Sequence, residues 1–335
     1  MPNTAMSKRT FISRMCLTGV AAAMLACGGL VQAADVVKIK IAYENNPGEP
    51  LDLAVKEWAR LFKQKTNGAG ELQLFPSSML GSKKDVIEQM KLGSNIITIA
   101  DGGFFADYVP DFGILMGPYL GKDYKDIFKL TKTDWFKDLS TKLDAKGLHI
   151  VTSNWLYGVR HMVVRKPVKT PADLKGVKIR VPNNRIQIEA MKQMGATPTP
   201  MPLAEVYPAL TQGAIDGAEN PITVLYGLKH HEPAKYLIKT GHLDNVSQWV
   251  IGQSYFAKLP ANIQKALVDA GNEAGDFMTN SVAKAEADTI EKMKKEGVTV
   301  VEVDRNLFRQ AAAGTYKQFP EWTPGLYEKV QGYLK

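Results

Sequence analysis

The chain has 335 residues, of which 45% are apolar and 23% are charged, a composition typical of a soluble globular protein. This length exceeds what one compact core usually holds, so two domains are expected. Disordered and collagen-like classes are excluded, because 28 glycines, 18 prolines and a modest charge imbalance fit neither. The net charge of +8 comes from 42 basic and 34 acidic residues that are interspersed along the chain. Without a basic stripe, nucleic acid is not an expected partner.

The first 34 residues have the organisation of a cleavable export signal. Three basic residues and no acidic ones begin it, and an apolar run with small residues covers 15–31. Val31 and Ala33 then supply the small side chains that a signal peptidase requires, which predicts cleavage after Ala33 or Ala34. Removing this signal peptide, residues 1–34, leaves 39 basic and 34 acidic residues, a net charge of +5.

Both cysteines, Cys16 and Cys27, lie inside this signal segment. The mature chain is therefore expected to contain no disulfide, no zinc-thiolate site and no cysteine nucleophile. An alternative is a lipoprotein signal over residues 25–27, which would leave Cys27 acylated. A membrane-spanning anchor is not expected, because the apolar run is short and is interrupted by Gly19 and Gly28.

After the signal, predicted strands and helices alternate along the chain. The first helix has apolar residues at helical spacing from Leu51 to Phe62, and it ends near Asn67 and Gly68. In chain order the expected elements are a strand at 38–43, a helix at 51–62, a strand at 71–75, a helix at 82–92, strands at 96–100, 148–153, 159–164 and 177–181, a helix at 185–194 and a strand at 215–218. The alternation occurs twice and predicts an α/β fold with a parallel or mixed sheet covered by helices.

One long helix is predicted from Ala261 to Lys295, a stretch rich in Ala, Lys and Glu that contains no proline. At a rise of 1.5 Å per residue it reaches roughly 50 Å, more than the width of one domain. We therefore expect it to run across both.

The sequence contains no complete enzyme motif, so we predict no catalytic activity, no metal centre and no cofactor. The stretch 117–122 (GPYLGK) has one residue too few between its glycines for a phosphate-binding loop. His230 and His231 precede Glu232, but Lys235 occupies the position where a metalloprotease needs its second histidine. These histidines are instead expected to be a solvated pair at a helix end.

Two arginines are the candidate ligand-binding residues. Arg160 lies in a predicted strand, and Arg180 lies at the end of another, where a side chain can reach into a cleft between domains. An arginine fork donates two parallel hydrogen bonds to a carboxylate and keeps its charge near neutral pH. The alternative for each arginine is an ordinary salt bridge to a nearby Asp or Glu, and spacing alone does not decide between them.

Four sequence blocks that include these arginines occur in a fixed order. They are PSSMLGS at 76–82, ADLKGVKIRVPNN at 172–184, GATPTPMPLAEVYPALTQGAIDGAENP at 195–221 and KYL at 235–237. In these blocks the chain resembles the periplasmic solute-binding proteins of tripartite ATP-independent periplasmic (TRAP) transporters, and the resemblance covers nearly the whole mature chain.

The resemblance implies a two-lobed periplasmic binding protein fold with a hinge and a long lobe-spanning helix. It also implies a periplasmic protein that is not an enzyme, closes on an organic acid and passes it to the large and small subunits of a membrane permease. Lobe I would comprise residues 35–157 and 246–285, and lobe II residues 158–245 and 286–335. Arg180 matches the family arginine that forms a bidentate salt bridge to the substrate carboxylate. Arg160 matches a second family arginine, and Asn220 a polar ligand contact.

Lobe I is expected to contact the rest of the ligand through loops that follow its strands. The candidates from those loops and from the rest of the cleft are Tyr43, Glu44, Asn45, Asp101, Phe104, Tyr157, Leu203 and Tyr207. Trp155 and Phe105 are further candidates for stacking on a sugar face, although aromatic residues of this kind more often belong to the core.

The loop at 100–108 (ADGGFFADY) lacks the arginine that sialic-acid binders of the family place nearby, which argues against sialic acid. Glu44 and Asp101 suit ligand hydroxyls and would repel a second carboxylate. The expected ligand is therefore a polyhydroxy monocarboxylate such as a uronate or aldonate, with a four-carbon dicarboxylate or a 2-oxo acid as alternative. Two other roles stay open: an exported sensor subunit that presents its ligand to a receptor kinase, and an exported hydrolase or lyase.

Overall fold

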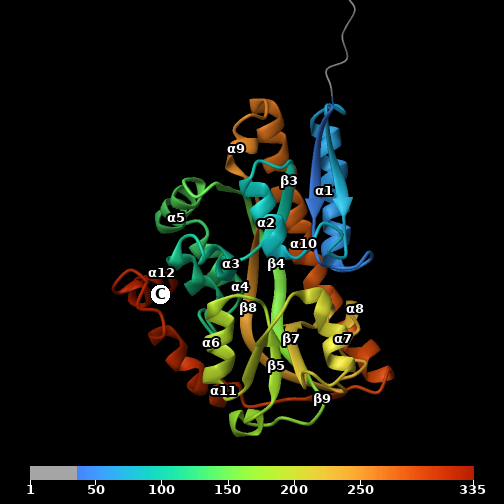
Figure 1. Cartoon of the computed structure of the whole chain (residues 1–335), viewed down its shortest axis with the longest axis vertical. Coiled ribbons are helices and arrows are strands. Elements are labelled where there is room, and N and C mark those ends of the chain that lie inside the picture. The colour runs from blue at the N-terminus through green and yellow to red at the C-terminus, as the bar shows by residue number, and fades with distance from the viewer. Residues whose placement is uncertain (1–35) are drawn as a thin grey trace, which may run out of the picture. The chain divides into compact units, whose positions relative to one another are not determined.

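The structure is a computed structural model that describes residues 36–335, so the predicted signal peptide lies outside the described residues. Within these residues nine strands form one sheet in the order β2-β1-β3-β8-β4-β7-β5-β6, and β9 pairs with β8. The strands are β1 (Val37–Ala42), β2 (Gly70–Phe75), β3 (Ile96–Ala100), β4 (Leu148–Val164), β5 (Lys178–Val181), β6 (Thr197–Pro200), β7 (Gly217–Pro221), β8 (Tyr236–Gly252) and β9 (Thr299–Val301). Two parallel groups, β2-β1-β3 and β7-β5-β6, are joined by the antiparallel strands β8 and β4 (Figure 1).

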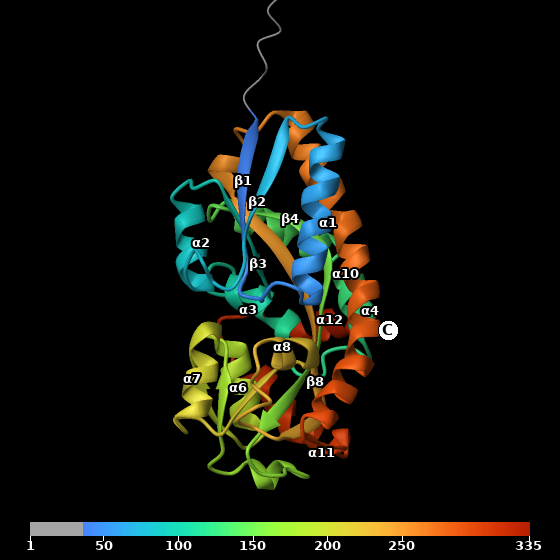
Figure 2. The same ribbon diagram turned by 90° about the vertical axis from the view of Figure 1, so that its right-hand side faces the viewer.

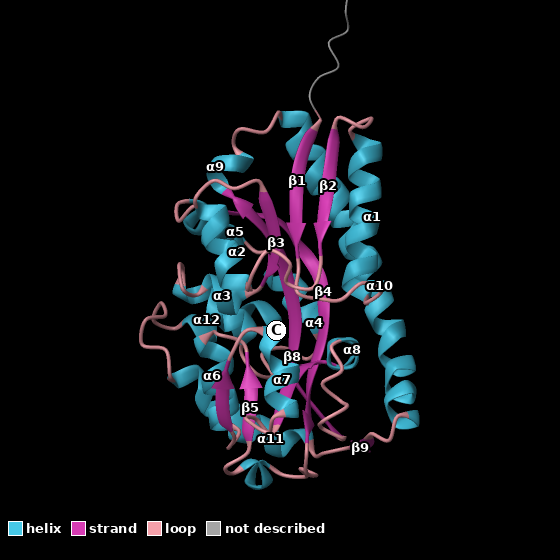
Figure 3. Cartoon of the chain, turned by 45° about the vertical axis from the view of Figure 1, so that its right-hand side comes forward, coloured by secondary structure: helices cyan, strands magenta, loops and turns pink. Residues whose placement is uncertain are grey.

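Helices cover this sheet (Figure 3). They are α1 (Pro50–Lys65), α2 (Lys83–Lys91), α3 (Gly102–Phe105), α4 (Tyr124–Leu130), α5 (Asp134–Asp144), α6 (Arg185–Gln193), α7 (Val206–Thr211), α8 (Ile222–Gly227), α9 (Gln253–Phe256), α10 (Ala261–Lys295), α11 (Arg305–Ala312) and α12 (Leu326–Leu334), with 3-10 helices at Pro110–Met116, Pro171–Leu174, Leu203–Glu205 and Ala313–Lys317. Local sequence fixes their starts. Pro50 occupies the first turn of α1, and the Ser82 and Asp85 side chains form a capping box at the start of α2.

The strands β4 and β8 lie between the two parallel groups and connect them. The sequence analysis predicts two strands in place of β4 and no strand at β8. The prediction of separate strands at 148–153 and 159–164 is wrong, because β4 is one strand of 17 residues. Register shifts interrupt its pairing with β8, one of them between Leu156 and Gly158, and Gly158 has φ +133. A positive φ is readily adopted only by glycine, and the resulting bend breaks the sequence pattern of a single strand.

Three apolar clusters form the core. The first surrounds Trp58, Trp155 and Trp249 and extends through β1–β3, α1 and much of α10. The second and third lie around β7 and β5. Residues 319–334 pack in the first cluster, whereas the sequence-based division assigns them to lobe II. We therefore propose that lobe I includes the C-terminal segment in addition to residues 36–157 and 246–285.

The helix α10 has the bounds that the sequence predicts, Ala261 to Lys295. Met278 packs in the first cluster and Met293 in the second, so the helix contributes to both parts of the molecule. It packs along α1 and β4, and its C-terminal part reaches α8 (Figure 2). None of the helices within residues 36–335 combines the length and the apolar character needed to cross a membrane.

Candidate functional site

A cleft lies where strands of the two parallel groups end. Residues that follow the carboxyl ends of β1, β3, β5 and β6 line it, together with side chains from β4, β7 and β8. Its lining consists of Glu44, Ser82, Lys83, Lys84, Ile99, Ala100, Asp101, Phe104, Tyr157, Arg160, Arg180, Pro182, Asn183, Met201, Pro202, Leu203, Asn220, Asn245 and Ser247. The empty space amounts to about 570 Å³, part of it open to solvent. Clefts at the carboxyl ends of strands are the usual ligand sites of α/β proteins.

Arg180 is a buried cation without a carboxylate partner in residues 36–335. Only 4% of the residue is exposed, and its hydrogen bonds within the described chain go from Nε and Nη2 to the Met201 carbonyl, at 3.1 and 2.8 Å. These two bonds use one edge of the guanidinium. The Nη1–Nη2 edge remains available, and that edge is suited to a bidentate carboxylate. Burial lowers the pKa of Arg180 to about 10, against the attraction of Glu219 and Glu44.

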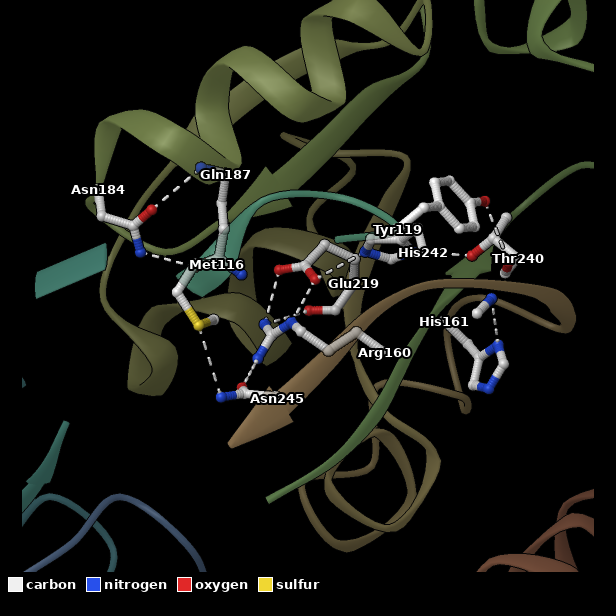
Figure 4. A network of polar contacts seen from close by, with 11 residues as sticks. Met116, Tyr119, Arg160, His161, Asn184, Gln187, Glu219, Thr240, His242 and Asn245 are labelled. Atoms are coloured by element: carbon white, nitrogen blue, oxygen red, sulfur yellow. Dashed lines mark hydrogen bonds and ion pairs between the residues drawn. The ribbon is translucent and has the colours of Figure 1, made fainter. Parts of the chain in front are cut away.

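Arg160, in contrast, is already paired. Its Nε and Nη2 donate to the two carboxylate oxygens of Glu219 at 2.5 and 2.7 Å, and its Nη1 donates to Asn245 Oδ1 at 2.9 Å (Figure 4). A further bond of 3.2 Å joins Nη2 to the Glu219 carbonyl. Four of its five N–H donors are thus engaged within the protein. Arg160 lines the cleft, but its charge is balanced by Glu219.

Glu219 is 1% exposed and also accepts a hydrogen bond from His242, with 3.3 Å between its Oε2 and the Nε2 of His242. Burial by itself raises the pKa of this carboxyl. The charge and hydrogen bonds of Arg160, with help from His242, outweigh burial and bring the pKa to about 2. Glu219 therefore stays ionised and fixes the orientation of Arg160.

A second ion pair lies on the wall supplied by lobe I. Lys83 Nζ is 3.0 Å from Glu44 Oε2, donates to the Ile99 carbonyl at 2.7 Å, and lies 5.5 Å from the centre of the Phe104 ring. The loop at 100–108 carries no positive charge of its own, and Lys83, at the start of α2, brings to this wall a positive charge that is balanced by Glu44.

The remaining predicted residues of the cleft have defined surroundings. Asp101 is buried and accepts a hydrogen bond from Gly103 N at 3.0 Å, which caps α3. Burial raises the pKa of Asp101, although Lys83 and Arg160 act in the opposite direction.

The apolar and amide side chains complete the lining. Phe104 packs in the first apolar cluster and Leu203 in the second, and both line the cleft. Burial raises the pKa of the Tyr157 hydroxyl, which donates to Asn45 Oδ1 at 3.0 Å. Asn220 is 2% exposed, and its Oδ1 has no hydrogen-bond partner among the described residues. A buried amide of this kind is expected to find a partner when the site is filled.

Three predicted site residues do not line the cleft. Tyr43 is buried and donates to Asp52 Oδ1 at 2.8 Å. Asn45 is buried as well, and its Nδ2 donates to Glu49 Oε2 at 2.7 Å. Its Oδ1 accepts the hydrogen bond from the Tyr157 hydroxyl, so Asn45 helps to position Tyr157. Tyr207 lines a separate surface hollow, and its hydroxyl donates to Glu232 Oε2 at 2.7 Å.

Two aromatic candidates for stacking are core residues. Trp155 is fully buried, 5.2 Å from the ring of Trp249, and its indole N–H donates to the Gly271 carbonyl at 3.0 Å. Phe105 is fully buried at 5.3 Å from the Phe112 ring. Both residues therefore belong to the first cluster, in agreement with the core role that the sequence analysis gives as the more common one.

The histidine pair at 230 and 231 is not solvated, so that prediction is wrong. Both residues are almost fully buried. His231 Nε2 lies 2.7 Å from Glu296 Oε2, and its ring stacks on Tyr226 at 4.8 Å. No group of three or more His, Cys, Asp or Glu residues in the described part of the chain is arranged to hold a metal ion.

Sequence reasoning missed several lining residues. Lys83 directly follows the block at 76–82, and Met201 lies within the block at 195–221. The sequence blocks could therefore have pointed to both residues. Asn245 and Ser247 belong to β8, which was not predicted at all. Glu219 was quoted as part of a block, and only the antiparallel register of β4 and β7, which pairs Met162 with Glu219, brings it beside Arg160.

Residues on the two sides of the cleft approach each other at two places. A Cβ added at Gly103, in α3, would lie 2.7 Å from the side-chain amide of Asn184, which caps α6. Asn46 Nδ2 donates to the Gly227 carbonyl at 3.1 Å, a second contact between the two sides. Residues on the two sides of the cleft are therefore in contact in the described chain.

Comparison with known proteins gives a consistent result. Residues 41–321 match the model of the family "Bacterial extracellular solute-binding protein, family 7". A TRAP periplasmic solute-binding protein from Ochrobacterium anthropi with bound L-fuconate is 50% identical, with a TM-score of 0.88 over 90% of this chain and 100% of that one. A second one, from Actinobacillus succinogenes with bound L-galactonate, is 45% identical, with a TM-score of 0.88 over 89% and 99%. The 2,3-diketo-L-gulonate-binding periplasmic protein of Escherichia coli K12 is 35% identical over 82% of this chain and 84% of its own length.

Proposed function

Because the chain belongs to bacterial extracellular solute-binding protein family 7 and is a solute-binding protein of the TRAP type, we propose that it captures a polyhydroxy monocarboxylate in the periplasm. The expected ligands are aldonates, uronates and related keto sugar acids. The closed, loaded protein then delivers the acid to the large and small subunits of a TRAP permease. A cleavable signal peptide takes the chain to that compartment.

The observation that carries this proposal is the unpaired, buried guanidinium of Arg180. A buried cation is costly unless a counter-charge and hydrogen bonds compensate for its lost hydration. Arg180 lines the cleft, and its Nε and Nη2 donate to the Met201 carbonyl, which leaves Nη1 without a hydrogen-bond partner in residues 36–335. A ligand carboxylate supplies the missing negative charge and accepts two parallel hydrogen bonds.

The balance of charges supports one ligand carboxylate. Of the cations that line the cleft, Arg160 is paired with Glu219, Lys83 with Glu44 and Lys84 with Asp107. Arg180 is the remaining one. The ligands named for the three relatives above each carry a single carboxylate on a chain bearing hydroxyl or keto groups, which favours the same class here.

The mechanism follows from the position of Arg180 and Asn220 in one lobe and of Glu44 and Lys83 in the other. The acid first binds the arginine while the lobes are apart. The opposite wall then reaches its hydroxyl groups, and these contacts favour closure because they exist only when the lobes meet. Closure removes water from the Arg180–carboxylate pair, which strengthens it. The same movement brings together the two lobe surfaces that the permease would recognise.

The proposal is tested by a thermal-shift screen of the protein purified from the periplasmic fraction. The acids screened are aldonates, uronates, keto acids, four-carbon dicarboxylates, sialic acid and amino acids. A ligand at 100 times its dissociation constant adds about 2.7 kcal/mol to the folded state, enough to raise the melting temperature by several degrees. We expect shifts confined to the sugar acids. A shift with dicarboxylates alone would overturn the ligand class.

The role of Arg180 is tested by Arg180→Ala, with Arg185→Ala as the matched control. Arg185 is nearby in the chain but exposed, with an ion pair to Glu321 outside the cleft. We expect Arg180→Ala to abolish ligand binding and to leave the melting temperature without ligand unchanged or higher, since it removes a buried unpaired charge. Arg185→Ala should bind like the unmodified protein. Retained affinity in Arg180→Ala would refute the assignment of the carboxylate site.

A further inference from the structure

The Glu44–Lys83 pair is the most informative group on the wall opposite Arg180. Its two side chains are mostly shielded, with 14% of Glu44 and 13% of Lys83 exposed. Lys83 is held from three directions, by Glu44, by the Ile99 carbonyl and by the face of the Phe104 ring. An ammonium held in this way stays at the cleft wall. Whether Glu44 is charged or neutral therefore determines the net charge of that wall.

In residues 36–335, Glu44 is the one carboxylate within ion-pair distance of Lys83. Asp101 is near enough to feel the lysine charge, but its Oδ1 is engaged by Gly103 N at the start of α3. Lys84 also lines the cleft and is different in kind. It is 46% exposed, and its Nζ is paired with Asp107 at 2.9 Å.

From this arrangement we infer that the Glu44–Lys83 pair is a specificity element that admits hydroxyl groups and rejects a second carboxylate. An ammonium has N–H donors only, and a carboxylate has acceptor oxygens only. Side by side they match a hydroxyl, which accepts from Lys83 and donates to Glu44. A second ligand carboxylate also accepts from Lys83, but it has no proton for Glu44 and meets its negative charge.

This inference rests on the proposed function, since it takes Arg180 as the site of the first carboxylate. It adds which residues decide between a monocarboxylate and a dicarboxylate of the same length. It also makes a directional prediction. Neutralising Glu44 leaves two cations, Arg180 and Lys83, at opposite walls, and the cleft should then favour a diacid.

The test compares two acids that share one carbon skeleton, L-galactonate and its diacid galactarate, by isothermal titration calorimetry. The unmodified protein should bind L-galactonate more tightly. In Glu44→Gln the ratio of the two affinities should shift toward galactarate by at least about tenfold, because juxtaposed like charges are a strong source of discrimination. In Lys83→Met both acids should bind more weakly, without a shift toward the diacid. The matched control is Lys91→Met, because Lys91 is also in α2 but pairs with Glu88 and does not line the cleft; it should leave the ratio unchanged.

The outcomes separate the two proposals. If L-galactonate binds in an Arg180-dependent manner and Glu44→Gln leaves the ratio unchanged, the role of the pair is refuted and the proposed function stands. If no sugar acid binds the unmodified protein, the proposed function itself fails. Thermal unfolding of each variant without ligand verifies that it folds, and because both side chains belong to the cleft wall, we expect unfolding close to that of the unmodified protein.

Discussion

Replacing Glu219 by glutamine should destabilise the folded protein by about 3–5 kcal/mol, the usual cost of breaking a buried ion pair. Only 3% of Arg160 and 1% of Glu219 are exposed, and the guanidinium donates to both carboxylate oxygens at 2.5 and 2.7 Å. Glutamine keeps the shape of the side chain and one acceptor oxygen. It leaves the charge of Arg160 uncompensated where water does not reach.

The pKa of Glu219 gives a second route to this magnitude. Burial raises the pKa of Glu219, but the charges and hydrogen bonds of Arg160 and His242 have a larger effect and lower this pKa from 4.5 to about 2. At about 1.4 kcal/mol per pKa unit, this difference corresponds to about 3 kcal/mol. Because the pKa is lower in the folded state than in the unfolded state, the stabilisation is present above pH 4.5 and is lost as the pH falls toward 2. Both routes give the same order of magnitude.

Urea denaturation at pH 7 measures the effect in Glu219→Gln, Arg160→Met and the double variant Arg160→Met/Glu219→Leu. Each single variant should lose several kcal/mol, whereas the double variant should recover most of it, because an apolar pair has no charge to desolvate. Asp269→Asn is the matched control, since Asp269 pairs with Lys265 in an exposed position and should cost less than about 1 kcal/mol. A double variant as unstable as the two singles combined would refute the reasoning.

Two further predictions concern buried groups outside the ligand-contacting wall. Burial lowers the pKa of His161 from 6.5 to about 3, so its neutral form stabilises the fold above pH 6.5 and about 2 kcal/mol is lost as the pH falls to about 5. His161→Asn keeps an acceptor for Gly241 N, which lies 3.0 Å from Nδ1 of His161. Urea denaturation at pH 7 and pH 5 should therefore show a smaller loss of stability at low pH in this variant than in the unmodified protein. An unchanged loss would contradict the assignment of the pH dependence to His161. Gly271→Ala in α10 should destabilise, because a Cβ would lie 2.7 Å from the Trp58 ring, whereas Gly332→Ala in α12, with nothing within 4 Å, should stabilise by up to about 1 kcal/mol. Thermal unfolding of the two alanine variants measures this contrast, and a shift of the same sign in both would be evidence against the packing argument.

The elements that sequence predicted well are those whose pattern is local. The helix α10 is continuous and free of proline, and its predicted bounds agree with the structure. The strand β8 was missed, because its 17 residues carry His, Asp, Asn, Ser and Gln side chains that are mostly buried, so no alternation of apolar and polar residues marks it. Burial of those polar groups depends on partners in β4 and β3, which a local pattern does not reveal.

The cleft illustrates the same limit. Sequence blocks identified Arg160 and Arg180 equally well, and spacing left open for each whether it binds a ligand or forms a salt bridge. The structure separates them, because strand pairing brings Glu219 to Arg160 and brings a backbone carbonyl to Arg180. Lys83 escaped notice for a related reason: it lines the cleft only because α2 packs beside the end of β3, far from Arg180 in the chain.

The way the first core is assembled from distant segments has a consequence for how the chain reaches its folded state. That core needs α1 and β1–β3 from the N-terminal part, the stretch from Val246 to Val282, and finally Phe319 to Leu334. A polypeptide that emerges N-terminus first, from a ribosome or through a narrow channel, cannot complete this core until residue 334 has emerged. Contacts of such long sequence separation form slowly. The first core therefore stays incomplete while the chain is being synthesised or translocated, and its folding is completed only afterwards.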